Sequence, residues 1–350
     1  MAARQDPLWV PLLTHFRAGG GGVVVDPVRM AAQIRAMQPE VRQYLLGGST
    51  GDGWELDEHQ FGDLISLSRT EVFTGTRVLM GVLRPTTGEV IARARMVERA
   101  LVHDGPPRGV YAGLTVCPPV APEASQGSIL AHYRAVLEAT ESPIAVYQLP
   151  QITGCSLEPA TVRTLARDPR IIMFKDTSGT DTVASAGPIP GVAMVRGAEG
   201  GYLAALAPSG PYDGWLLSSA NVFGRVLRRI LDLHAADEGA RASRLSGILA
   251  MVVEALFDAA AEIAFGNPFS NANRAADHVL ATGRTWRDVP APLSASGNAL
   301  PARLLEAAAD ILEALRAVSD AGYLPVRKIS PRAKLRPIEE GAQPRVHHRR

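Results

Sequence analysis

Short apolar runs alternate with amphipathic helical patterns from the N-terminus to residue 236 of the chain. Most of the runs are continuous rather than alternating, which is typical of parallel strands buried on both faces. They predict strands over residues 9–14, 41–47, 77–82, 109–114, 143–147, 170–175, 192–197 and 213–218. The helical patterns between them predict helices over residues 26–37, 56–74, 89–102, 128–139, 158–167, 180–186, 200–207 and 225–236.

This order of elements predicts an α/β fold, a (β/α)₈ TIM barrel over residues 1–235, because strand-then-helix units fill a length of barrel size. The rival is a doubly wound open sheet, which would carry a G-x-G-x-x-G turn directly after its first strand. The chain instead has four glycines at 19–22, well past that strand, and we expect them to form a flexible loop. No Walker-type phosphate loop occurs.

The strand pattern stops after residue 236. Helical patterns at 240–265, 270–282 and 300–321 predict a C-terminal helical region over 236–326, which we expect to serve packing or oligomer contacts. Its sequence Gly266–Asn271 is interpreted as a structural loop and helix cap. Residues 327–350 are basic and contain prolines, so we expect a mobile tail.

The amino-acid composition limits the partners and ligands that we expect for this protein. The 350 residues are 46% hydrophobic and carry 36 basic against 35 acidic side chains, a formal charge of +1. This balance gives no reason to expect nucleic acid or a membrane surface as a partner. Cys117 and Cys155 are the only cysteines, and the histidines lack metal-ligand spacing, so no metal is predicted. With no secretory signal visible, we expect a cytoplasmic protein.

Lys175 ends the apolar run of the predicted strand 170–175. It is the only lysine before Lys328, where nearly all other basic residues are arginines. At the carboxyl end of a barrel strand it would point into the mouth where barrel active sites lie. Burial lowers the pKa of an amine, and a neutral amine can attack a ketone to form an imine, which arginine cannot do. The alternative is a strand-edge lysine that reaches water or pairs with Asp176.

Two further candidate site residues or turns lie at the carboxyl ends of predicted strands. Tyr147 ends strand 143–147, within reach of Lys175 if the strands are adjacent, and its phenol could move protons during imine chemistry. The alternative is a tyrosine that only fills the core. The turn Gly47–Asp52 follows the second strand, and its small residues and hydroxyls suit a carboxylate, although a plain turn would have a similar composition.

Three motifs together resemble one enzyme family: G-S-T-G-D at 48–52, V-Y-Q-L-P at 146–150 and F-K-D-T-S-G at 174–179. They resemble the dihydrodipicolinate synthase and N-acetylneuraminate lyase family of class I, Schiff-base (β/α)₈ enzymes, over roughly residues 7–235. The resemblance implies pyruvate or a related 2-oxo acid as substrate, an aldehyde as a second partner, no cofactor, and a homo-oligomer, either a dimer or a tetramer.

The resemblance also implies roles for individual residues. Lys175 would form the imine, Tyr147 would transfer protons, and Thr50 would take part in that proton transfer. The remaining assignments concern substrate binding and fall on Gly48, Ser49, Thr50, Gly197 and Ser218.

The chain departs from the lysine-pathway synthases at two places. Ile152 stands where they carry an arginine for the aldehyde's carboxylate, and Cys117–Val120 replaces their tyrosine pair. We therefore expect a carbon–carbon or carbon–oxygen lyase, cleaving or condensing a 2-oxo acid, other than dihydrodipicolinate synthase itself. The stretch 117–126 resembles 5-dehydro-4-deoxyglucarate dehydratases, whereas Gln148–Pro150 does not. A sugar-acid dehydratase and a non-catalytic ligand-binding barrel are the alternatives.

Overall fold

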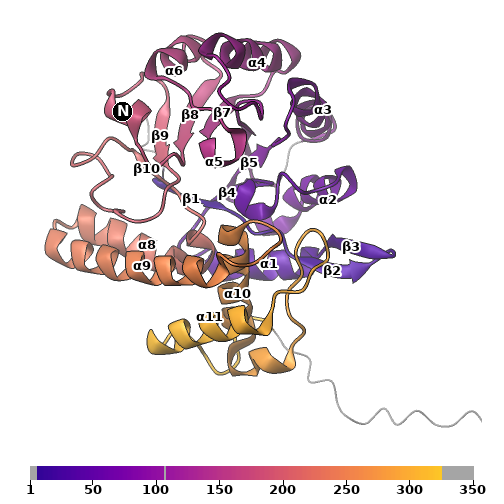
Figure 1. Cartoon of the computed structure of the whole chain (residues 1–350), viewed down its shortest axis with the longest axis vertical. Coiled ribbons are helices and arrows are strands. Elements are labelled where there is room, and N and C mark those ends of the chain that lie inside the picture. The colour runs from indigo at the N-terminus through magenta and orange to yellow at the C-terminus, as the bar shows by residue number, and fades with distance from the viewer. Residues whose placement is uncertain (1–5, 106–107, 325–350) are drawn as a thin grey trace, which may run out of the picture.

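The computed structural model describes residues 6–105 and 108–324. Within them, eight parallel strands close into a barrel in the order β1-β10-β9-β8-β7-β6-β5-β4 (Figure 1). The closed parallel barrel confirms the predicted (β/α)₈ fold. The predicted tail 327–350 lies outside the described residues. The strands of the barrel are β1 (Leu8–Pro11), β4 (Gln43–Leu46), β5 (Arg77–Gly81), β6 (Val110–Val116), β7 (Ile144–Gln148), β8 (Ile171–Asp176), β9 (Ala193–Arg196) and β10 (Gly214–Leu216).

Helices surround this barrel, and several of them begin at a residue whose side chain caps the helix. Asp26 accepts backbone hydrogen bonds at the start of α1, and Asp57 and Gln60 form a reciprocal capping box on α2. The helices along the barrel are α1 (Pro27–Met37), α2 (Glu58–Ser68), α3 (Thr87–Glu98), α4 (Gln126–Ala139), α5 (Pro150–Thr153), α6 (Pro159–Leu165), α7 (Thr182–Ser185) and α8 (Ala220–Ala235).

The barrel interior is a packed core rather than a pore. One side chain from each strand contributes to a buried apolar layer, formed by Trp9, Leu45, Leu79, Ala112, Ala145, Met173, Val195 and Leu216. Side chains alternate along a strand, so the residues two positions after Ala145 and Met173 face the same interior, one layer closer to the carboxyl ends. Those residues are Tyr147 and Lys175.

Two sequence predictions are wrong. The glycines expected to form a flexible loop make the tip of a β-hairpin, β2 (Phe16–Gly19) with β3 (Gly22–Val25). Gly20 and Gly21 both have positive φ, 61° and 83°, which a two-residue hairpin turn requires. The predicted helix at 200–207 is a series of turns, because Gly200 and Gly201 also adopt positive φ and so cannot begin a helix.

The C-terminal helices α9 (Gly239–Ala260), α10 (Pro268–Thr282) and α11 (Ala302–Ala314) pack together and lie at one end of the molecule, with α10 facing the barrel (Figure 1). Asn267 caps α10 by accepting from the backbone N–H groups of Phe269 and Ser270, as its sequence predicts. Within the described ranges, each helix is too short or too polar to cross a membrane.

Candidate active site

Tyr147 and Lys175 are direct partners across the paired strands β7 and β8. Both side chains point into the barrel and are almost fully buried, with exposed fractions of 2% and 3%. The Lys175 Nζ lies over the Tyr147 ring, 3.7 Å from its centroid. The two strand ends therefore bring together the residues that the sequence singled out, with the amine against the face of the phenol.

Burial changes the ionisation of Lys175. Desolvation lowers its pKa from the usual 10.5 to about 7, and the nearby Cys117 and Glu199 oppose that shift only in part. Asp176, the alternative ion-pair partner, is engaged elsewhere: its Oδ1 accepts from Gln148 and from the backbone of Ser178. A large fraction of the Lys175 amine is consequently neutral and nucleophilic near neutral pH.

The Tyr147 phenol is surrounded by hydroxyl groups. Burial raises its pKa, and the nearby hydroxyls of Ser49 and Thr177 lower it in part. Thr177 Oγ1 is itself buried and makes no well-formed hydrogen bond with a described residue. A buried hydroxyl of this kind is available to a ligand. Sequence reasoning did not single out Thr177, although it follows Lys175 at the two-residue spacing of one strand face.

The turn after β4 supplies the opposite wall of the site. Ser49 and Thr50 begin the short 3₁₀ segment Ser49–Gly51, and both line the cavity while being only 6% exposed. The Trp54 Nε1 donates to Ser49 Oγ at 3.0 Å, which fixes that hydroxyl. Gly48 is not among the lining residues; it caps the 3₁₀ segment, where a Cβ would lie 2.8 Å from a Leu45 methyl group.

Helix α10 holds this turn in place. The last residue of the motif, Asp52, forms a buried ion pair with Arg274 of α10, and both side chains are nearly inaccessible. Arg274 also donates to the carbonyl of Thr14, and Ser270 donates to the carbonyl of Ser49. The C-terminal region thus determines the position of the two hydroxyls, a role beyond the packing expected from the sequence.

Gly197, at the end of β9, leaves room for the amine. A Cβ at this position would lie 2.2 Å from Thr177 Oγ1 and 2.9 Å from Lys175 Cε. Any larger residue would have to displace one of these side chains, since real Cβ atoms do not make such contacts. Gly197 therefore lines the cavity and leaves space next to Lys175, while its role in substrate binding stays a prediction.

Glu199 is a cavity residue and not a solvated loop acid. Its carboxylate accepts from Ser218 Oγ at 2.8 Å, from the backbone and hydroxyl of Ser219, and from the Tyr202 phenol. Ser218, for which substrate binding stays a prediction, lines the cavity, and its proton is directed to Glu199. Arg84, which follows β5, points away from this cavity and pairs with Glu58 at 2.8 Å.

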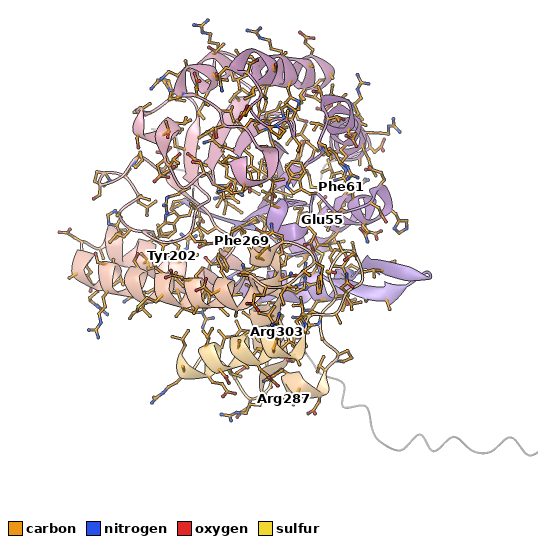
Figure 2. All side chains as sticks on the ribbon, viewed as in Figure 1. Glu55, Phe61, Tyr202, Phe269, Arg287 and Arg303 are labelled. Carbon is orange, nitrogen blue, oxygen red and sulfur yellow. The ribbon has the colours of Figure 1, made fainter. Side chains whose placement is uncertain are left out.

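One cavity of about 520 Å³ lies at the carboxyl ends of the strands. It is lined by the site residues described above, namely Ser49, Thr50, Tyr147, Lys175, Thr177, Gly197, Glu199 and Ser218. Its outer wall includes residues that sequence reasoning missed or interpreted as structural: Glu55, Phe257, Gly266, Asn267, Pro268 and Phe269. Figure 2 shows Glu55 and Phe269 in the region between the barrel and the C-terminal helices. Within the described ranges, no group of three His, Cys, Asp or Glu side chains could hold a metal ion.

Comparison with known proteins agrees with this geometry. The model of the dihydrodipicolinate synthetase family matches residues 34–266. A 4-hydroxy-tetrahydrodipicolinate synthase of Stenotrophomonas maltophilia is 27% identical over 234 residues, which is 65% of this chain and 73% of the relative. A second such synthase, from Streptomyces coelicolor, is 28% identical over 252 residues, covering 71% and 77% of the two chains.

Solved structures share the fold. YagE, an E. coli K12 prophage protein of the dihydrodipicolinic acid synthase family in complex with pyruvate, superposes with a TM-score of 0.71 at 21% identity, covering 88% of this chain and 98% of its own. CdNal from Clostridium difficile, in complex with mannosamine, gives 0.72 at 15% identity, covering 89% and 99%. The family match and the fold show that the chain belongs to the dihydrodipicolinate synthetase family and is an enzyme of its class I, Schiff-base lyase type.

Proposed function

We propose that the enzyme acts on pyruvate or a related 2-oxo acid through an imine at Lys175, cleaving or forming a carbon–carbon bond. The observation that carries this proposal is a buried amine with a lowered pKa, placed against Tyr147 in a cavity that also holds the Ser49–Thr50 turn. The complex of the related YagE with pyruvate supports the choice of substrate.

The mechanism follows from where the groups lie. The neutral Lys175 amine attacks the ketone carbon, and loss of water gives a protonated imine. The hydroxyls of Ser49 and Thr50 hold the 2-oxo acid's carboxylate, and Thr50 and Tyr147 move protons to and from the reacting oxygens. The iminium then accepts the electron pair released when a neighbouring carbon–carbon bond breaks. Because this cation withdraws the electrons, the reaction needs no further cofactor.

We further propose that the reaction differs from that of the synthases that this chain resembles. Ile152, at the position implied for their carboxylate-binding arginine, lines the cavity with an apolar side chain. Cys117 replaces part of their tyrosine pair and is buried beside Tyr147 in an apolar cluster. A cavity without that arginine has no evident means of holding an aldehyde's carboxylate.

Dehydration is the second candidate. The same iminium would assist loss of water from a β-hydroxy acid, and Glu199 places a carboxylate on the cavity wall that could accept the released proton. Incubation with 2-oxo acids that carry a β-hydroxyl group distinguishes the two reactions, because cleavage releases an aldehyde whereas dehydration keeps the carbon chain intact.

Reductive trapping tests the proposed function. Borohydride added with pyruvate should attach a reduced pyruvate adduct to the protein, and peptide mapping should find it on Lys175. The Lys175→Arg variant keeps a cation but cannot form the imine, so it should show no adduct. Failure of every tested 2-oxo acid to form an adduct would contradict the proposal and favour a non-catalytic barrel. The expected homo-oligomer stays a prediction, to be checked by light scattering.

A further inference from the structure

The charges that line the cavity limit the kind of second substrate that it can accept. Lys175 is the one basic residue among the described lining side chains, and its nitrogen carries no charge in the enamine that attacks the second substrate. The two other charged residues of the lining, Glu55 and Glu199, are acidic. A second carboxylate would therefore meet acidic groups and no cation at the moment of attack, which is unfavourable in a partly desolvated site. Glu55 contributes less of this repulsion near neutral pH, because burial raises its pKa to about 7.

One part of the cavity's outer wall is apolar, although that wall also includes Glu55 and Asn267. Phe257 of α9 and Phe269 of α10 pack with ring centroids 4.8 Å apart and planes tilted by 55°. Ile152 of α5 and Leu149 line the cavity as well, and Pro268 completes this wall. Phe269 and Ile152 are 43% and 37% exposed, so this wall offers apolar surface that the folded chain itself leaves uncovered.

Two of the polar side chains nearby, Glu199 and Asn267, already make hydrogen bonds within the protein. Both Glu199 oxygens accept hydrogen bonds from Ser218 and Ser219, and Tyr202 donates to the same carboxylate. Asn267 uses its side-chain oxygen to cap α10. The outer wall consequently offers few free donors for a polyhydroxylated substituent, and an apolar group would lose least on leaving water.

We propose that the electrophile of this enzyme is an aldehyde with an uncharged aromatic substituent, which lies against the Phe257–Phe269 pair and Ile152. This inference rests on the proposed imine chemistry and names its second substrate. Aromatic rings gain from tilted or offset contact with other rings as well as from burial. The aldehyde carbon would face the imine while its ring occupies the outer wall.

The proposed condensation balances with no further reagent. The enamine formed from pyruvate at Lys175 donates its electron pair from C3 to the aldehyde carbon, and a carbon–carbon bond forms. The carbonyl π electrons move onto the aldehyde oxygen, which takes up the proton that C3 released earlier, and the iminium is restored. Water then adds to the iminium and releases a 4-hydroxy-2-oxo acid together with the free amine.

A direct test offers the full-length enzyme pyruvate with three aldehydes: benzaldehyde, succinic semialdehyde and glyceraldehyde. Product formation is followed by mass spectrometry. We expect kcat/KM for benzaldehyde to exceed that for each of the others at least about tenfold. Preference for succinic semialdehyde or glyceraldehyde, or no product with any of the three, overturns the inference.

Two variants locate the preference in the structure. Phe257→Ala should raise the KM for benzaldehyde about tenfold or more with a smaller change in kcat. The matched control is Met251→Ala on the same helix, 64% exposed and away from the cavity, which should behave as wild type. Ile152→Arg supplies the missing cation and should shift the preference toward succinic semialdehyde. Unchanged selectivity in both cavity variants overturns the assignment of this wall.

Borohydride trapping with pyruvate alone separates this inference from the function on which it rests. An adduct on Lys175 without a preference for the aromatic aldehyde rejects the second-substrate assignment and leaves the imine chemistry standing. Absence of any adduct rejects both.

Discussion

The Lys175 nitrogen contacts the face of the Tyr147 ring rather than its phenol oxygen, at 3.7 Å from the ring centroid. The ring and the hydroxyl of Tyr147 can therefore act separately. The ring covers the amine on one side, whereas the phenol, beside Ser49 and Thr177, is placed to move protons on the substrate.

Tyr147→Phe separates these two contributions. It keeps the ring under the amine and removes only the hydroxyl, so the yield of the trapped pyruvate adduct at long times should change little. Turnover should fall about 10²–10⁴-fold because a general acid–base group is lost. Parallel measurement of kcat and adduct yield checks this prediction. A loss of adduct in proportion to the loss of turnover would show that the phenol acts mainly on imine formation.

The pH dependence of imine formation should report the Lys175 pKa of about 7. The protonated amine cannot attack, so the initial rate of adduct formation with pyruvate and cyanoborohydride should rise about tenfold per pH unit below that value and level off above it. The measurement is the adduct mass as a function of time across the pH range. A midpoint close to the ordinary value of 10.5 would contradict the burial argument.

The same shift predicts a cost in stability. The pKa of Lys175 is lower in the folded protein than in the unfolded chain, so the unfolded chain binds more protons between about pH 7 and pH 10. The free energy of unfolding should therefore rise with pH across that window through this residue. Lys175→Met removes the buried ammonium and should raise the free energy of unfolding at pH 7 by roughly 2–4 kcal/mol. Denaturant unfolding at pH 7 and pH 10 tests this, because the gain should shrink at the higher pH.

Gly197→Ala should disturb the amine without unfolding the barrel. The added Cβ must displace Lys175 or Thr177, so the rate of adduct formation should fall by about tenfold or more, since displacements on the order of 1 Å at a reacting group have large effects. Gly247→Ala is the control: it lies on the exposed side of α9 with open space at its Cβ position. That variant should keep full activity and gain about 0.5–1 kcal/mol of stability.

Arg274→Met tests the ion pair between α10 and the turn after β4. It leaves Asp52 as a buried carboxylate without its counter-ion and should lower the free energy of unfolding by about 3–5 kcal/mol. Arg303→Met is the matched control, since its pair with Glu262 is exposed and should change stability by less than about 0.5 kcal/mol. Chemical denaturation of both variants checks this difference. The double variant Arg274→Met with Asp52→Asn should recover part of the loss, whereas strict additivity would contradict the coupling.

The barrel and the meeting of Lys175 with Tyr147 could be predicted from sequence, because both depend on local patterns. Continuous apolar runs indicate buried parallel strands, and residues at the ends of neighbouring strands must lie together once the barrel closes. The turn at Ser49 and Thr50 could be placed at the same end of the barrel for the same reason, because it directly follows a barrel strand. The structure confirms the fold, and the roles of these residues stay predictions.

The outer wall could not be predicted, because it depends on tertiary packing. Phe257 and Phe269 belong to helices far along the chain, and nothing in their local pattern distinguishes them from core positions. Asp52 looked like an ordinary turn residue, since its partner Arg274 lies more than two hundred positions away. The helix predicted at 200–207 is absent because Gly200 and Gly201 adopt positive φ, a conformation that glycine allows and its presence alone does not dictate.

The Asp52–Arg274 pair has a consequence for how the molecule can be divided. A fragment ending at residue 235 would retain every strand of the closed barrel, yet it would lose the guanidinium that pairs with Asp52 and the α10 hydroxyl that contacts the Ser49 carbonyl. Geometric closure of the sheet and energetic autonomy are thus different properties here. We therefore expect the smallest unit that keeps the catalytic turn in place to extend through α10.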